Sequence, residues 1–126
     1  MKALRRKPTD AELAILRVLW TRGPSTVRQV AEALGRETGY TTALKFLQIM
    51  TEKGLVVRDE ADRTHIYEAA YTQHQTQRQL VTDLLDRAFD GSAAQLVLQA
   101  LSTNKASPEE LDEIRKLLAA KSGGSR

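Results

Sequence analysis

A stretch between residues 40 and 55 presents polar side chains at a spacing that could recognise nucleic acid. They recur at i, i+4, i+7 and i+11 and so share one face of a helix: Thr41, Lys45, Gln48 and Glu52. The apolar face of the same helix consists of Leu44, Leu47 and Met50. Short hydroxyls, an amide and a cation suit the base edges and phosphates of a DNA groove. Ordinary amphipathic surface helices show the same pattern, so the neighbouring elements must decide between the two interpretations.

The first element expected before this stretch is a helix that begins with a capping box. The Thr9 hydroxyl can accept a hydrogen bond from the backbone N–H of Glu12, and the Glu12 carboxylate can accept one from that of Thr9. The core-facing stripe of this helix consists of Leu13, Leu16, Leu19 and Trp20. Gly23-Pro24 is expected to end it.

A second, shorter helix follows with a capping box of its own. Thr26 and Gln29 have the same hydroxyl-to-amide spacing, and Gly35 is the stop signal. The short, glycine-containing link 36–39 then leads into the polar-faced helix. Two helices joined in this way, the second with a polar outer face, predict a helix-turn-helix.

The pattern changes after Gly54 from a helical period to alternation. Residues 55–58 and 64–68 are rich in β-branched and aromatic side chains, and a polar turn separates them, which predicts a β-hairpin. Three helices followed by a hairpin are the order of a winged helix, in which Arg63, and Arg58 as a further candidate, would contact DNA phosphates. Three carboxylates in the turn argue against strong binding of DNA by the hairpin tip.

Three amphipathic helices are expected after residue 72. Their apolar faces exceed what a small helical hairpin can bury, which favours pairing with a second copy of the chain. The expected dimerisation residues are Leu80, Leu84, Phe89, Leu96, Val97, Leu101, Leu111, Ile114 and Leu118. Folding back onto the winged module in a monomer is the alternative. The predicted organisation is mainly α with a small β-hairpin: a winged helix-turn-helix at 1–71, a helical dimerisation module at 72–121 and a disordered tail at 122–126.

Composition and charge narrow the possible functions. The chain has no cysteine, so disulfides and thiolate metal sites are excluded. Of its two histidines, His65 is expected to be a half-buried strand residue and His74 is expected to be exposed to solvent. The sequence has no glycine-rich phosphate loop, no nucleophile elbow and no paired-carboxylate signal. We therefore expect that the protein is not an enzyme and binds no cofactor or metal. No apolar run approaches the roughly 18 residues of a membrane span, which favours a cytoplasmic protein without a membrane partner.

The positive charge lies in the first half of the chain. Residues 1–70 hold 12 Lys and Arg against 9 Asp and Glu, whereas residues 71–126 hold 7 of each, so the net charge of +3 belongs to the first half. The first half is therefore the expected polyanion binder, and the basic tail 2–7 could add phosphate contacts.

Several motifs together resemble a known family. In order they are Thr9-Asp10-Ala11-Glu12-Leu13 with Val18-Leu19-Trp20, then Thr26-Val27-Arg28, Tyr40-Thr41-Thr42, Glu52-Lys53-Gly54-Leu55 and His65-Ile66-Tyr67. Their order and spacing resemble the penicillinase repressor family of winged-helix transcriptional regulators, the BlaI/MecI type, over about residues 8–120.

The resemblance implies a homodimer that binds inverted-repeat operators and represses transcription. By position, Thr41, Thr42 and Lys45 match the groove-reading helix of the family, Thr26 and Arg28 the helix before it, and Arg63 the wing. Family members are typically induced when a membrane sensor triggers cleavage at an Asn-Phe bond. Gln99-Ala100 stands at that place here, which puts a protease or sensor partner in question. The absence of cysteine also excludes the cysteine cluster of the copper-responsive branch.

The leading hypothesis is a homodimeric, sequence-specific repressor that binds double-stranded DNA. Bases would be read by Thr41, Thr42, Lys45 and Gln48. Phosphates would be contacted by Arg28, Lys53, Arg63 and the basic tail. The alternative is a winged-helix protein–protein interaction module without sequence-specific DNA binding, because fold alone does not determine function. A ligand-sensing repressor is a third, weaker reading, because no convergent polar cluster marks a pocket.

Overall fold

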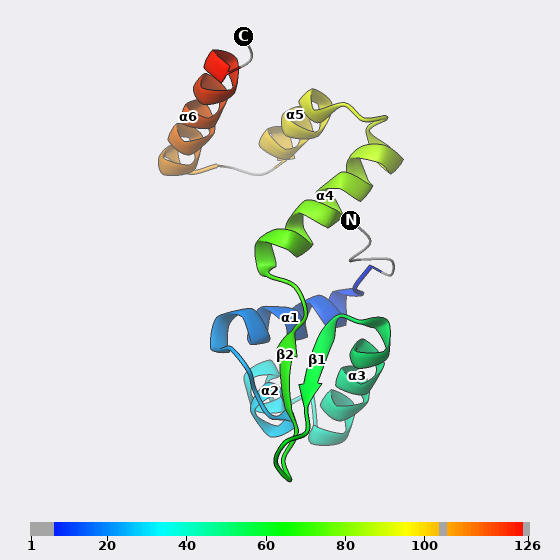
Figure 1. Cartoon of the computed structure of the whole chain (residues 1–126). Coiled ribbons are helices and arrows are strands. Elements are labelled where there is room, and N and C mark those ends of the chain that lie inside the picture. The colour runs from blue at the N-terminus through cyan, green and yellow to red at the C-terminus, as the bar shows by residue number, and fades with distance from the viewer. Residues whose placement is uncertain (1–6, 104–105, 125–126) are drawn as a thin grey trace. The chain divides into compact units, whose positions relative to one another are not determined.

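The computed structural model describes residues 7–103 and 106–124, and within them the chain forms six helices and one two-stranded sheet (Figure 1). The elements are α1 (Asp10–Arg22), α2 (Val27–Leu34), α3 (Tyr40–Lys53), β1 (Val56–Asp59), β2 (Ile66–Ala69), α4 (Gln73–Ala88), α5 (Ala93–Thr103) and α6 (Pro108–Gly124). The expected mainly helical fold with one hairpin is confirmed. None of the described helices is long and apolar enough to cross a membrane.

The chain divides into two compact units, Met1–Thr82 and Asp83–Arg126. The division falls inside α4, whereas the sequence pattern places it before that helix, after residue 71. The difference has a structural reason: Thr76, in the first turns of α4, is only 2% exposed, so this part of the helix packs with the winged module.

The starts of α1 and α2 follow the predicted capping boxes. The backbone N–H of Thr9 donates to Glu12 Oε1 (2.9 Å), and the N–H of Glu12 donates to Thr9 Oγ1 (3.2 Å). Thr26 and Gln29 make the same reciprocal pair at 2.9 and 3.1 Å. These bonds satisfy backbone donors that a helix start otherwise leaves unpaired.

The core of the first unit lies between α1, α2, α3 and the inner face of the hairpin. Figure 1 shows the hairpin across α1, with α2 on one side and α3 on the other. The buried apolar residues are Ile15, Leu16, Leu19, Val27, Val30, Ala31, Ala43, Leu47, Met50, Leu55, Val56 and Tyr67. α3 contributes Ala43, Leu47 and Met50, while Leu44, expected on this face, is only half-buried. Residues i, i+4 and i+7 from position 43 therefore form the buried stripe.

The hairpin begins directly after α3. Gly54 ends the helix in the left-handed conformation (φ 80°), and the backbone N–H of Leu55 donates to the carbonyl of Met50 at 2.9 Å. The strands pair antiparallel, with Arg58 opposite Tyr67. His65 lies just before β2 and is exposed, so the expectation of a half-buried strand residue is wrong: β2 starts one residue later.

A backbone bridge fixes the hairpin to the helices. The N–H of Ser25 donates to the carbonyl of Tyr67 (2.9 Å), and the N–H of Tyr67 donates to the carbonyl of Ser25 (2.8 Å). The segment between α1 and α2 thus adds one paired residue to the edge of β2. Both side chains are 1% exposed, so the bridge lies in the interior of the winged module.

The second unit has little interior of its own. None of its described residues is buried, and four of the expected dimerisation residues are at least 40% exposed: Leu84, Val97, Leu101 and Leu118. The other five expected residues are half-buried: Phe89, Leu96, Leu111 and Ile114 in this unit, and Leu80 in the part of α4 that belongs to the first unit. The last helix, α6, extends to Gly124 and so includes three residues of the expected disordered tail, because no stop signal precedes them; residues 125 and 126 lie outside the described part.

Candidate nucleic-acid interface

The polar face of α3 is open to solvent along its length. Ala43, Leu47 and Met50 are fully buried at 0% exposure on the opposite side and fix the rotation of the helix. The predicted base-reading residues are all exposed: Thr41, Thr42, Lys45 and Gln48. The buried stripe thus directs hydroxyls, an amide and an ammonium away from the core, where base edges could meet them.

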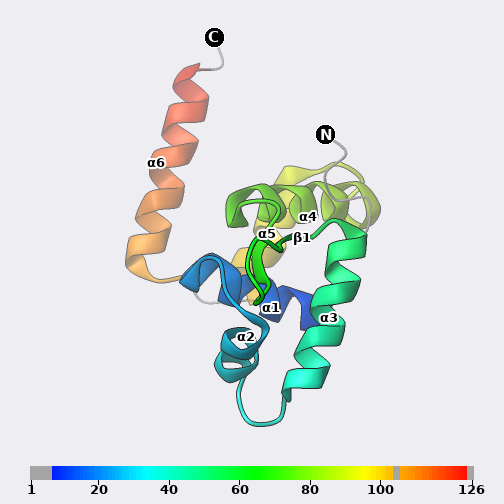
Figure 2. The same ribbon diagram turned by 60° about the horizontal axis from the view of Figure 1, so that its bottom comes forward.

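The start of α3 and the turn of the hairpin lie at the same end of the first unit (Figure 1). Figure 2, turned so that this end comes forward, shows α2, α3 and the loop that joins them. A groove of about 680 Å³ lies here. It is lined by Thr26, Val27, Arg28, Tyr40, Leu44, Gln48, Arg58, Arg63, Thr64, His65 and Tyr67. Four predicted site residues therefore border one groove: Thr26, Arg28, Gln48 and Arg63.

The lining of this groove is positively charged. Three arginines contribute to it, and none of its lining residues is an aspartate or glutamate. The guanidinium of Arg28 lies over the ring of Tyr40, 5.9 Å from its centre. A cation held against an aromatic face keeps its charge and loses some of its freedom, which favours contact with a polyanion.

Arg58 is a further residue of this groove, which sequence reasoning left outside the main candidates. A hydrogen bond with the Tyr67 side chain, together with an ion pair to Glu60, raises the pKa of its guanidinium. Its Nε is buried and has no hydrogen-bond partner among the described residues. Arg58 pairs with Tyr67 across the two strands, and directly paired residues face the same side of a hairpin. The expected pairing of the two strands could therefore have indicated that Arg58 lies beside Tyr67.

Lys53 lies elsewhere. Its Nζ is 2.7 Å from Glu12 Oε1, and the two side chains are only 15% and 4% exposed. Burial alone raises the pKa of the Glu12 carboxyl, but the hydrogen bonds from Lys53 and from the Thr9 N–H outweigh burial and lower it. Because this ammonium joins the end of α3 to the start of α1, we do not count Lys53 among the candidate phosphate contacts. The basic tail, apart from Lys7, lies outside the described residues.

Three helices, the third with an exposed polar face, and a paired hairpin define the winged-helix fold. One solved structure with this fold is the YusO protein from Bacillus subtilis, with a TM-score of 0.50 and 17% identity over 94% of this chain and 77% of that chain. The family model described as penicillinase repressor matches residues 8–120. The chain therefore belongs to the penicillinase repressor family of DNA-binding repressors.

Two relatives illustrate the range of similarity. The chain is 35% identical over 118 residues to the transcriptional regulator BlaI of Mycobacterium tuberculosis, covering 91% of this chain and 85% of the relative. It is 22% identical over 112 residues to the penicillinase repressor of Bacillus licheniformis, covering 87% and 88%. Both matches span nearly the full length, so they include the second unit as well as the winged module.

Proposed function

We propose that the protein is a homodimeric repressor that recognises an inverted-repeat operator through α3 and the adjoining groove. The observation that carries this proposal is the groove, which bears three arginines and no carboxylate beside the exposed face of α3. The exposed helix face can contact base edges in a DNA groove, and the cationic groove beside it can contact the phosphates that border that DNA groove.

The residues divide into two roles. Thr41, Thr42, Lys45 and Gln48 read base edges, because their exposed polar groups lie on α3. Thr26, Arg28, Arg58 and Arg63 contact phosphates, because they line the groove at its side. Phosphate contacts provide affinity for any duplex, and the helix face provides discrimination between sequences.

The second unit supports the homodimer. Leu101 and Leu118 are 40% and 60% exposed. Exposure of apolar surface to water is unfavourable, so covering these side chains with another surface would lower the free energy. A second copy of the same helices can cover them symmetrically, and two winged modules then face two half-sites. This is the arrangement that an inverted repeat requires.

Induction by proteolysis at the position of the family's scissile pair would require a change in the structure of α5. Gln99 and Ala100, which occupy the position of the family's scissile pair, lie inside α5. The carbonyl of Gln99 accepts a hydrogen bond from the hydroxyl of Thr103 at 2.9 Å. Cleavage at this point would require α5 to unwind locally first.

A binding titration tests the proposed function. The purified protein is titrated against duplex DNA from upstream of its own gene and against a scrambled duplex of equal composition, at about 0.15 M salt where non-specific contacts weaken. We expect strong preference for the upstream duplex with two protomers bound per site. Equal, weak binding to both would contradict sequence recognition and favour a protein-interaction role for the winged module.

A further inference from the structure

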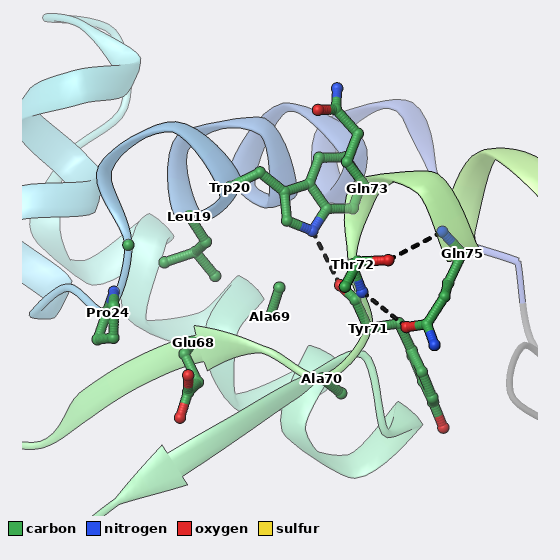
Figure 3. A pocket seen from close by; sticks show the side chains of 11 residues that line it. Leu19, Trp20, Pro24, Glu68, Ala69, Ala70, Tyr71, Thr72, Gln73 and Gln75 are labelled. Carbon is green, nitrogen blue, oxygen red and sulfur yellow. Dashed lines mark hydrogen bonds between the residues drawn. The ribbon is translucent and has the colours of Figure 1, made fainter.

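Trp20 connects α1 to the segment that leaves the hairpin. It is the only tryptophan of the chain, and its indole N–H donates to the backbone carbonyl of Tyr71 at 2.9 Å (Figure 3). Tyr71 lies between β2 and α4, so this hydrogen bond joins positions 51 residues apart. A side chain from the first helix thus holds the main chain at the point where α4 is about to begin.

The start of α4 is also fixed by its own capping box. The backbone N–H of Thr72 donates to Gln75 Oε1 (2.9 Å), and the N–H of Gln75 donates to Thr72 Oγ1 (3.0 Å), as Figure 3 shows. Just before it, the N–H of Ala70 donates to the carbonyl of Leu55 at 2.9 Å. Residues 70–76 are therefore held to the winged module on one side and set into a helix on the other.

The Trp20 side chain contributes both packing and a directional hydrogen bond. Trp20 is only half-buried, and together with Leu19, Pro24 and Tyr71 it lines a hollow of about 420 Å³. Trp20 also packs against the core, but an aliphatic side chain in its place could not donate to the Tyr71 carbonyl. The indole combines an apolar body with one directional donor, which suits a group that fixes the path of a backbone segment.

We infer that Trp20 is a positioning residue that fixes the direction in which α4 leaves the winged module. The inference rests on the proposed homodimer, in which α4 continues into the unit that pairs with the second copy. A fixed exit from each winged module gives the two α3 helices one separation, and that separation sets the spacing of the half-sites. Trp20 thereby selects operators by spacing without touching DNA.

The decisive experiment measures the separation of the two winged modules directly. The chain has no cysteine, so Ala61→Cys in the exposed hairpin turn allows one spin label per protomer. Pulsed dipolar spectroscopy then reports the distance between the two labels of a dimer. We expect one narrow distance maximum with Trp20, and loss of that single maximum in favour of a broad distribution with Trp20→Phe, which keeps an aromatic ring but lacks the donor.

Matched variants separate this role from a general loss of structure. Tyr71→Phe removes only the phenol hydroxyl and keeps the carbonyl, so its distribution stays narrow. Gln75→Ala weakens the same turn from the exposed side and broadens the distribution without altering the core. An unchanged narrow maximum in Trp20→Phe overturns the inference. Absence of any dipolar signal in the Trp20 protein instead overturns the homodimer and, with it, this inference.

Binding to DNA provides a second measurement. The operator fragment is compared with one lengthened at its centre by about two base pairs, roughly a fifth of a helical turn. Trp20→Phe should reduce the preference for the original spacing by roughly two- to tenfold, as loss of one hydrogen bond allows, with unchanged affinity for an isolated half-site. Equal loss of affinity for every duplex would contradict a role in spacing.

Discussion

Lys53 Nζ lies 2.7 Å from Glu12 Oε1, and this ion pair joins the last turn of α3 to the first turn of α1. The same carboxylate accepts the backbone N–H of Thr9 in the capping box. Glu12 therefore both starts a helix and anchors the end of the proposed recognition helix. The orientation of α3 depends in part on a residue 41 positions before its partner.

Replacement of Lys53 by methionine should destabilise the fold far more than it affects DNA contacts. The change leaves the Glu12 carboxylate buried without a counter-charge, which costs on the order of 3 kcal/mol in the free energy of unfolding. Urea denaturation measures this loss, with Lys45→Met on the exposed face as the control. Lys53 would instead be a phosphate contact if Lys53→Met kept its stability but lost operator affinity.

The Glu12 carboxyl also predicts how stability depends on pH. Its pKa is lower in the folded chain than its ordinary value, so its contribution is fully present above about pH 4.3 and is lost as pH falls through the folded pKa. Unfolding free energies from neutral to acidic pH, compared with Glu12→Gln, measure this contribution. The two proteins should converge at low pH, and a constant difference between them would contradict the assignment.

Lys45→Ala should weaken operator binding by about 1–3 kcal/mol if the ammonium contacts a base edge. The loss should be largest for the preferred sequence, because non-specific duplexes do not use that contact. Lys116→Ala on α6, where the lysine pairs with Asp112, is the matched control for charge. Equal affinity of Lys45→Ala and the unchanged protein would remove Lys45 from the site.

Arg58→Gln should weaken binding to all duplexes alike. A phosphate contact releases about one counterion, so the slope of log affinity against log salt should fall by about one. Titrations at several salt concentrations determine the slope, and Arg115→Gln on α6 gives the same charge change outside the groove. A change in sequence preference with an unchanged slope would indicate a base contact for Arg58.

Val97→Glu should convert the proposed dimer into a monomer. The side chain is 42% exposed on α5, and a charge at that position would have to lose its water if a second copy covered it. Sedimentation equilibrium measures the mass, and Gln99→Glu places the same charge on a polar position of the same helix. A dimeric Val97→Glu protein would exclude this face from the interface.

The sequence is most informative where the relevant groups lie within one turn of each other and next to a clear apolar stripe. Capping boxes at Thr9 and Thr26 depend on residues three positions apart, and both formed. A further box at Thr72 has the same spacing, but the apolar stripe of its helix begins only at Leu80, so the pattern next to Thr72 does not indicate a helix start. Helix faces were recognisable because burial repeats with the helical period.

Long-range pairs could not be predicted in this way. The bond from Trp20 to Tyr71 and the ion pair of Lys53 arise only after α1, α3 and the hairpin have packed together. In the sequence an exposed lysine near the end of a helix resembles a phosphate contact, because burial of its partner is not visible. The place of Arg58 in the groove is not visible in the sequence for a related reason: its acidic neighbours in the turn do not show which side of the hairpin it faces.

The bridge between Ser25 and Tyr67 uses only main-chain atoms, so it does not depend on the residues of the hairpin turn. The turn at 60–65 can consequently be recoded or lengthened while both strands keep their attachment to the helices. In an evolving lineage or a designed library, the sequence of this turn can therefore change without loss of the attachment of the strands. Changes there would alter the strength of phosphate contacts through Arg63 while the fold and the base-reading face of α3 stay as they are.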